Sequence, residues 1–553
     1  MRNDTVIKED VVKSSTTFIL SVLLSLFIAN MLAVSAYAEN NAVSDAHELE
    51  ISVTCPDGKA SALIDGKEKS YTSASSVTIT SNSGEPFGSL YVIFDRIYGP
   101  WTLTYTDSDG ATHTANCGKD EFLHEYIDVE SELDSGITEL TLIFDSEPAS
   151  LSELHAFSSG KVPEWVQIWQ PPCSRADLLL ASTHVDDEQL FFAGILPYFA
   201  GELGYAVQVV YFTDPFSYHD RPHEQLNGLW TVGVKNYPVW ADFVDKLSET
   251  SEEAYRHQEK YGYTKDDMIR FQVETIRRFK PHVVVGHDIN GEYGHGQHMI
   301  NCETLMEALP LATDADYEAE SAAKYGVWDV PKTYIHLWNE NKIVMDWDVP
   351  LESFGGKTAF QVSQDGFMCH ESQHWTWFYE WIYGKNGKSI TKATEIRSSS
   401  PCKYGLYRSN VGLDSGIGDM FENIPQSYAE IEQEEKEREE RERLEKEREE
   451  RERAESESLA AESRLAAEEA SRLESELEES RRIEAEMTRT APTEPTGVPE
   501  TDLSDVSSRR TQGNLKATAG ILLFGVLAAV LLAAVAIHMK KGRDKRTYTN
   551  GKM

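Results

Sequence analysis

The sequence predicts an α/β Rossmann-like domain that is preceded by a β-sandwich and followed by a charged helical stalk and one transmembrane helix. Three patterns predict this order: short alternating strands over residues 45–165, strands alternating with helices over 171–420, and a stretch dominated by Glu and Arg over 428–488. A chain of 553 residues is long enough for two or three such domains.

The first 38 residues have the pattern of an export signal. Basic residues precede the apolar run from Phe18 to Leu32, and Ala36-Tyr37-Ala38 forms an A-x-A cleavage site. We therefore predict a signal peptide over residues 1–38, with an uncleaved N-terminal anchor as the alternative.

The six cysteines contain no C-x-x-C pair, which argues against a structural zinc site. In an exported chain some of them could form disulfides. Cys55 and Cys117 are the most natural pair, because both fall in one small domain. Free buried thiols are the alternative.

Residues 45–165 alternate between apolar and polar positions, with Gly, Ser and Asp turns in between, which predicts a β-sandwich. The final segment, Leu151–Phe157, resembles the last strand of discoidin-like, carbohydrate-binding sandwiches. A glycan-binding module and a spacer without a ligand both remain open. The expected strands include Val77–Thr80, Leu90–Phe94, Trp101–Tyr105 and Leu140–Phe144.

Apolar runs typical of buried parallel strands alternate with helical patterns over residues 171–420, a range predicted to form one domain. The strand runs begin at Leu178 and at Pro281. Further expected elements are helices over Leu190–Leu203 and Asp266–Phe279, a strand over Tyr205–Phe212 and a late strand near Pro331–Tyr334.

Polar side chains follow two of these strands where each strand ends. His184-Val185-Asp186-Asp187-Glu188 comes directly after the first, and the stretch from His287 to His298 follows the second. The carboxyl ends of strands in an open α/β sheet are where ligands bind. Three such side chains with one open position for water form the ligand set of a catalytic zinc, so Zn²⁺ is the expected cofactor.

These residues resemble the PIG-L/LmbE family of zinc-dependent N-acetylglucosamine de-N-acetylases, whose usual signatures are HPDDE and GEYGHxDH. This sequence has HVDDE at 184–188 and GEYGHGQH at 291–298. Weaker matches are R-x-x-E at 221–224 and H-x-S-Q at 370–373. The resemblance covers roughly residues 174–385 and rests on the two paired motifs, in order and each after a strand.

The resemblance implies that His184, Asp187 and His298 bind zinc and that Asp186 is the general base. Zinc lowers the pKa of its water, and an adjacent carboxylate can take the proton. Tyr293 and His295 would stabilise the oxyanion that forms at the acetamide carbonyl. Either Asp186 or His295 could pass a proton to the leaving amine, which gives acetate and a glucosamine.

Several positions leave alternatives open or depart from the family pattern. Arg221 could hold the substrate or pair with Glu224. Asp288 and Glu292 are expected to order the loop rather than bind metal. Lys357 and His370 fit a family element only with extra residues between them. Val185 replaces the usual Pro and removes no ligand.

Gln297 replaces the usual Asp of the second motif. That Asp would orient and charge His295, whereas Gln can hydrogen-bond an imidazole but cannot favour its cationic form. If Gln297 contacts His295, Gln297→Asp should therefore move the basic limb of the pH–rate profile upward.

The C-terminal part has the pattern of a stalk and an anchor. Residues 428–488 predict a solvated helix with weak self-association as a further option. Residues 491–515 are a linker, 517–537 an apolar run of spanning length, and 538–553 a basic tail. We therefore expect a single-pass type I protein of the cell membrane with its catalytic domain outside.

The leading hypothesis is zinc-dependent deacetylation of an N-acetylated glycan at the cell surface. A glycan-binding adhesin with a weakened or inactive deacetylase domain is the alternative, and a zinc hydrolase acting on a different amide is the third hypothesis. The net charge of −40 argues against nucleic acid as a partner, because nothing would neutralise its phosphates.

Overall fold

The computed structural model describes residues 45–489 except residue 417. The predicted signal peptide, linker, transmembrane segment and basic tail lie outside these described residues. Among the described residues, no helix combines the length and the apolar character that a membrane span requires.

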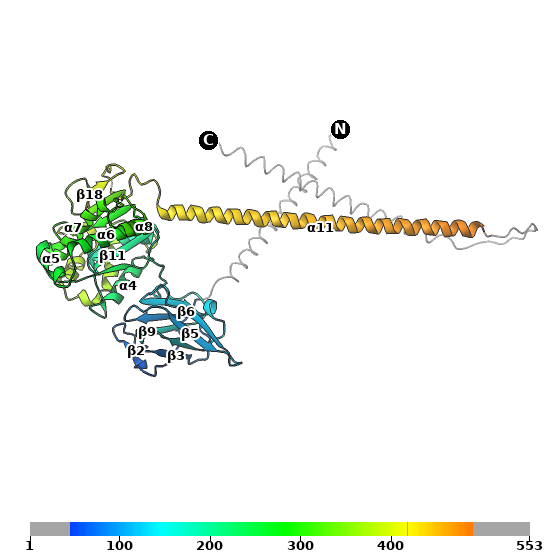
Figure 1. The fold of residues 1–553 in the computed structure, drawn as a ribbon, viewed down its shortest axis with the longest axis horizontal. Helices are drawn as coiled ribbons and strands as arrows, with labels where there is room; N and C mark the ends of the chain where they lie inside the picture. Colours follow the sequence, from blue (N-terminus) through cyan, green and yellow to red (C-terminus); the bar gives the residue numbers. More distant parts are fainter. Residues whose placement is uncertain (1–44, 417, 490–553) are drawn as a thin grey trace, which may run out of the picture. The chain divides into compact units, whose positions relative to one another are not determined.

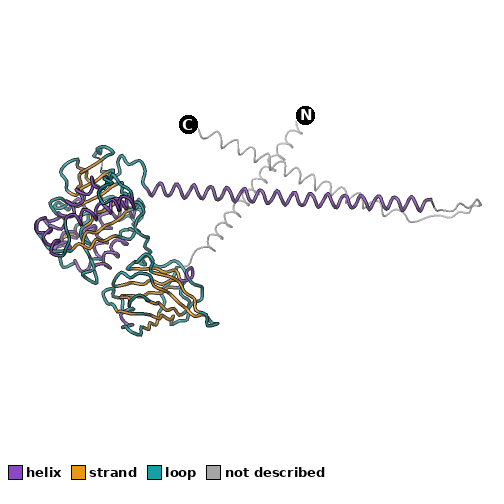
Figure 2. The backbone as a smooth tube through the Cα atoms, viewed as in Figure 1, coloured by secondary structure: helices purple, strands orange, loops and turns teal. Residues whose placement is uncertain are grey.

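Two antiparallel sheets form the N-terminal domain of the described residues, which was predicted over residues 45–165 (Figures 1 and 2). A five-stranded sheet has the order β1-β3-β8-β5-β6, and a four-stranded sheet has the order β2-β9-β4-β7. The strands are β1 (Ile51–Thr54), β2 (Thr72–Ala74), β3 (Ser76–Ser81), β4 (Ser89–Phe94), β5 (Trp101–Thr106), β6 (Thr112–Cys117), β7 (His124–Asp128), β8 (Glu139–Ile143) and β9 (Ala149–Phe157). A 3₁₀ turn η1 (Ala60–Ala62) and a short helix α2 (Val129–Glu132) connect strands of this segment.

The alternation of these strands places most of their apolar side chains in one core. Val77 and Ile79 of β3 are buried, whereas their neighbours are partly exposed. β4 is buried along its whole length because one face lies in this core and the other packs in a second cluster around Phe157 and Val166. Inward-facing residues of both sheets belong to the same hydrophobic cluster, which is how two sheets stabilise each other.

All six cysteines are free thiols, so the predicted pairing of Cys55 with Cys117 is wrong in this structure. Cys117 is buried at the end of β6, and burial raises the pKa of its thiol to about 12. A thiol in such surroundings behaves as a small apolar side chain.

A seven-stranded sheet forms the α/β segment, with the order β12-β11-β10-β13-β14-β18-β15. The first five of these strands are parallel, as the sequence predicted, whereas β18 and β15 are antiparallel additions at one edge. The strands are β10 (Leu178–Ser182), β11 (Val207–Thr213), β12 (Val239–Phe243), β13 (Val283–Gly286), β14 (Lys332–His336), β15 (Lys342–Val344) and β18 (Lys403–Ser409).

The central strands are continuously apolar because both faces of the sheet are covered. Leu178 and Leu180 of β10 pack into one hydrophobic cluster, and Leu179 and Ala181 into another on the opposite face. β13 divides in the same way, with Val284 facing the second cluster. A strand buried on two faces needs no polar alternation.

Helices cover this sheet, and several are labelled around β11 in Figure 1. They are α3 (Asp187–Leu190), η2 (Pro197–Glu202, π-helical), α4 (Arg221–Thr231), α5 (Ser251–Lys260), α6 (Lys265–Phe279), α7 (Gly296–Leu311), α8 (Ala319–Tyr325), α9 (Ala359–Met368) and α10 (Trp377–Tyr383). Shorter elements are η3 (Glu292–Gly294), η4 (Glu371–Gln373), η5 (Ala393–Glu395), β16 (Gly384–Lys385) and β17 (Lys388–Ser389). α6 begins at a capping box of Thr264 and Asp267, close to the predicted start.

The helix expected over Leu190–Leu203 is broken. Gly194 has a φ of +97°, and a Cβ there would lie 2.4 Å from the Trp347 ring. The chain therefore forms α3, an irregular turn and η2 in place of one continuous helix.

A single helix, α11 (Tyr428–Arg489), accounts for the charged stretch. Ion pairs at i,i+4 spacing run along it, for example Arg453 with Glu457 and Arg472 with Glu476. Leu444 and Leu465 on this helix are exposed. Self-association through this helix stays a prediction.

Candidate active site

The polar residues of the two motifs meet where the strand order reverses. β10 pairs with β11 on one side and with β13 on the other, and the chain visits β11 and β12 before it returns to β13. The loops after β10 and β13 therefore leave the sheet side by side at its carboxyl edge. This is the position at which open α/β sheets bind ligands.

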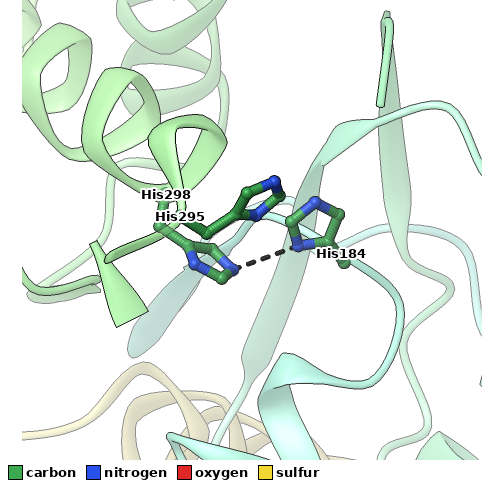
Figure 3. Close-up of side chains that lie close together, drawn as sticks. All are labelled: His184, His295 and His298. Atoms are coloured by element: carbon green, nitrogen blue, oxygen red, sulfur yellow. Dashed lines mark hydrogen bonds between the residues drawn. The ribbon is translucent and has the colours of Figure 1, made fainter. Parts of the chain in front are cut away.

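Three donor atoms converge at this edge. His184 Nδ1 lies 3.1 Å from His298 Nε2 and 3.3 Å from Asp187 Oδ2, and His298 Nε2 lies 3.1 Å from the same oxygen. Figure 3 shows the imidazoles of His184 and His298 facing each other, with His295 beside them. The three residues predicted as zinc ligands thus form one triangle.

The triangle fits a tetrahedral zinc ion. With zinc–ligand bonds of about 2.0–2.1 Å, tetrahedral geometry separates neighbouring ligand atoms by about 3.3 Å. The three observed separations lie within a few tenths of an ångström of this value. His287 also approaches Asp187, but its Nε2 accepts the Thr183 N–H at 3.0 Å and so has no lone pair for a metal.

The other nitrogens of the two histidines are held from outside the triangle. His298 Nδ1 faces the backbone carbonyl of Glu292 at 3.4 Å, and His184 Nε2 lies 3.2 Å from Asp245 Oδ1. Such partners fix the tautomer and the orientation of a ligating imidazole.

The carboxylates and imidazoles shift one another's pKa. Burial alone would lower the pKa of His184, but Asp245 and Asp187 raise it to about 10. Burial opposes ionisation of Asp187, yet His298 and His184 hold its pKa well below the usual range. His184 therefore carries a proton that a metal must displace.

Asp186 lies beside the triangle and contacts Arg221. Arg221 Nη2 is 3.2 Å from Asp186 Oδ2 and donates to the Val185 carbonyl at 3.3 Å. Burial raises the pKa of Asp186, although the Arg221 charge acts in the opposite direction. The alternative of an Arg221–Glu224 pair is wrong, because Glu224 accepts hydrogen bonds from the Ser372 backbone N–H and hydroxyl.

The rings of His295 and Tyr293 stack on each other beside the triangle. Their centroids are 5.6 Å apart and their planes are nearly parallel. Neither ring nitrogen of His295 has a hydrogen-bond partner among the described residues. Burial, with His184 and His298 adding to it, lowers the pKa of His295 to about 3. Burial and the carboxylates raise the pKa of Tyr293, so its hydroxyl stays protonated.

Gln297 does not contact His295, so the premise of the predicted pH effect is wrong. Its Oε1 accepts from Gln258 Nε2 at 3.1 Å, and its own Nε2 donates to the Lys246 carbonyl at 3.3 Å. Gln297 is fully buried between α5 and the loop after β12. It ties these segments to α7 and leaves His295 untouched.

Glu292 orders the second loop, as predicted. Its buried Oε1 faces His336 Nδ1 at 2.7 Å and His287 Nδ1 at 3.3 Å, and accepts the Asp288 backbone N–H at 3.2 Å. Gly291 has a φ of +73°, and a Cβ there would lie 2.4 Å from the His295 carbonyl oxygen. Tyr293 adopts a φ of +48°, a conformation that non-glycine residues rarely hold outside functional loops.

The site opens into a pocket of about 550 Å³. Its polar floor holds His184, Asp186 and Asp187. Exposed apolar side chains stand around its rim: Tyr218, Leu247, Tyr293 and Trp375, of which Trp375 is 85% exposed. The pocket thus combines ionisable side chains with exposed aromatic and aliphatic side chains near solvent.

Sequence reasoning missed one residue, Asp245, and one contact between two residues of the motifs. Asp245 follows β12, so the rule that found the other strand ends would have found it as well. Buried Glu188, whose pKa burial raises to about 8, faces His370 Nε2 at 3.7 Å, a contact between distant segments that no local pattern announces. Lys357, in contrast, forms an exposed ion pair with Asp365.

The relatives of this chain are sugar deacetylases. A 1D-myo-inositol 2-acetamido-2-deoxy-alpha-D-glucopyranoside deacetylase of Saccharopolyspora erythraea is 44% identical over 162 residues, which are 29% of this chain and 49% of that protein. One of Frankia casuarinae is 26% identical over 192 residues, 29% of this chain and 59% of that protein. The chain thus spans about half the length of these relatives. No family model matches the chain. The relatives confirm its resemblance to the PIG-L/LmbE deacetylases.

Two solved structures illustrate more distant likeness. N,N'-diacetylchitobiose deacetylase from Pyrococcus horikoshii is 15% identical with a TM-score of 0.29, covering 38% of this chain and 75% of that one. The F5/8 type C domain of a Bacteroides fragilis protein is 12% identical with a TM-score of 0.17, covering 21% and 97%. At such TM-scores the likeness assigns no function.

Proposed function

We propose that the protein is a zinc-dependent hydrolase that removes the acetyl group from an N-acetylated sugar of a glycan or glycoconjugate. The observation that carries the proposal is the triangle of His184, Asp187 and His298 with Asp186 beside it. The named activity of the relatives supports the acetamido sugar as substrate. Flat side chains at the pocket rim suit the apolar faces of sugar rings.

His184, Asp187 and His298 would hold the zinc ion, which when bound supplies a Lewis acid and lowers the pKa of water. Asp186, held by Arg221, accepts the proton of the attacking water. Tyr293, protonated at neutral pH, donates a hydrogen bond to the oxyanion. His295 is neutral at this pH, so Asp186 is better placed to return the proton to the leaving amine. Water and the amide are thereby converted to acetate and an amine.

We further propose that this reaction takes place outside the cell, with the chain anchored by its C-terminal apolar segment. The A-x-A motif and the basic residues after Ile537 support this proposal. Protease treatment of intact cells should release a fragment that contains the α/β domain. Full protection of residues 45–385 would contradict the topology.

The adhesin alternative drew its support from Gln297. Since Gln297 does not touch His295, this substitution gives no reason to expect a weakened catalytic site. Release of acetate from a panel of N-acetylated mono- and oligosaccharides tests the proposal. Acetate from none of them with zinc-loaded protein would refute it.

A further inference from the structure

Helix α4 lies between the active site and the two-sheet domain of residues 45–165. On one side it carries Arg221, which contacts Asp186, and Glu224, which binds Ser372. The apolar residues Leu226 and Leu229 fix it to the core but are non-directional contacts. Within the α/β segment, one further directional contact holds this helix, since Trp240 Nε1 donates to Gln225 Oε1 at 2.8 Å.

The two-sheet domain adds a second set of directional contacts to this helix and to the residue just before it. His219, just before α4, lies 2.5 Å from Asp95 Oδ1 through its Nδ1, and its ring stacks on Tyr71 at 4.5 Å. His223 Nδ1 lies 2.8 Å from His124 Nε2, and Asn227 Nδ2 donates to Glu68 Oε2 at 2.9 Å. Positions 219, 223 and 227 recur every four residues, whereas the residues that face the active site lie between them.

The His124–His223 contact is buried and directional. Burial lowers the pKa of His223 to about 4 and holds the pKa of His124 well below its usual range, so both rings are neutral at pH 7. Between two neutral rings one nitrogen must donate and the other accept. His124 Nδ1 in turn lies 2.9 Å from the buried Tyr91 hydroxyl, which extends the connection into β4.

We propose that the two-sheet domain positions Arg221 against Asp186 by holding α4 through Asp95, His124 and Glu68. These are positioning residues, because none of them lines the active-site pocket. Loss of one contact lets α4 shift, and a shift of about 1 Å can lower turnover by up to about 100-fold. The kinetic part of this inference rests on the proposed deacetylase function.

The test uses the full chain with His219→Ala, a change at a half-exposed side chain. We expect kcat to fall at least 10-fold with KM changed less than threefold and zinc content unchanged. Asp95→Ala removes the same contact and also the hydrogen bond from Ser150 Oγ, so it should lower kcat at least as much. The double variant should lose less than the sum of the two single losses, because both variants lack the contact between Asp95 and His219. His219→Asn, which keeps a donor near the Nδ1 position, should restore most of the turnover.

Tyr237→Phe is the matched control. The Tyr237 hydroxyl accepts the Leu123 backbone N–H at 2.8 Å across the same domain boundary but does not contact α4. We expect its kcat to remain within twofold of the wild-type value. An equal loss in Tyr237→Phe and His219→Ala would show a general interface defect and overturn the proposal.

Hydrogen–deuterium exchange of the α4 backbone provides a readout that needs no activity. His219→Ala should raise exchange over residues 223–231, and Tyr237→Phe should not. Unchanged α4 exchange in His219→Ala would overturn the positioning role whether or not the chain releases acetate. Raised exchange with no acetate released even by wild-type protein would support the positioning and refute the deacetylase function.

Discussion

Replacement of Asp245 by Asn should change how zinc binding depends on pH. The carboxylate lies 3.2 Å from His184 Nε2 and, with Asp187, raises the pKa of His184 to about 10 despite burial. Asn keeps an oxygen acceptor but removes the charge. The pKa of His184 should therefore fall, and its imidazole should be less firmly oriented.

The magnitude follows from the proton that zinc displaces. At pH 7 a histidine with a pKa of about 10 gives up its proton at a cost of about 4 kcal/mol. The apparent Kd of wild-type protein should therefore rise about tenfold for each pH unit below 9. Loss of an orienting partner weakens metal binding by about 10–100-fold, while the lower His184 pKa acts in the opposite direction. The pH slope thus separates the two effects.

Zinc affinity measured by competition with a chelating dye from pH 6 to 9 provides the assay. In Asp245→Asn the apparent Kd should become independent of pH at a pH about 1–3 units lower than in wild type. Asp242→Asn, at an exposed position of β12, is the matched control and should follow the wild-type curve. Identical slopes for wild type and Asp245→Asn would refute the assigned role of Asp245.

Three further substitutions test the surrounding contacts. Glu292→Gln should lower the free energy of unfolding by about 3 kcal/mol, measured by urea titration, because it removes a buried charge that two histidines share. Arg221→Met should move the acid limb of the kcat/KM profile up by about 1–3 pH units, since Asp186 loses the cation that lowers its pKa and so loses its basic form at higher pH. Gln297→Asp should lower the melting temperature, because it buries a charge beside the Lys246 carbonyl, and should leave the basic limb in place.

For each of these three substitutions, one result would contradict the prediction. A free energy of unfolding equal to that of wild type in Glu292→Gln would contradict the role of Glu292 in ordering the loop. An unmoved acid limb in Arg221→Met would mean that Arg221 does not tune Asp186. A basic limb that moves upward in Gln297→Asp would restore the contact with His295 that the structure lacks.

Local sequence patterns predicted the parts of the fold that local physics determines. Leu178–Ser182 and Val283–Gly286 are apolar on both faces, so their place in a parallel sheet could be inferred. The break at Gly194 could not, because it depends on Trp347, which is distant in sequence. The antiparallel strands β15 and β18 were missed for a similar reason, since their pairing is long-range.

In the active site, too, the local sequence predicted some features, whereas others depend on contacts between distant residues. The position of the two motifs after neighbouring strands predicted that their polar side chains would lie close together, and the resemblance to the deacetylase family implied that His184, Asp187 and His298 are the ligands. They could not show which partner each side chain takes. Arg221 contacts Asp186 and not Glu224, and Gln297 contacts Gln258 and not His295. The ligand triangle could be predicted from sequence, whereas its supporting contacts required the structure.

The measurement that tests the central claim most directly is acetate release by Asp186→Asn with its zinc content determined on the same sample. Asp186 lies outside the ligand triangle, so the variant should keep the zinc of wild-type protein and lose most of its turnover. His298→Ala should lose the zinc as well, because it removes a ligand. Wild-type turnover in zinc-loaded Asp186→Asn, or equal loss of zinc in the two variants, would contradict the account.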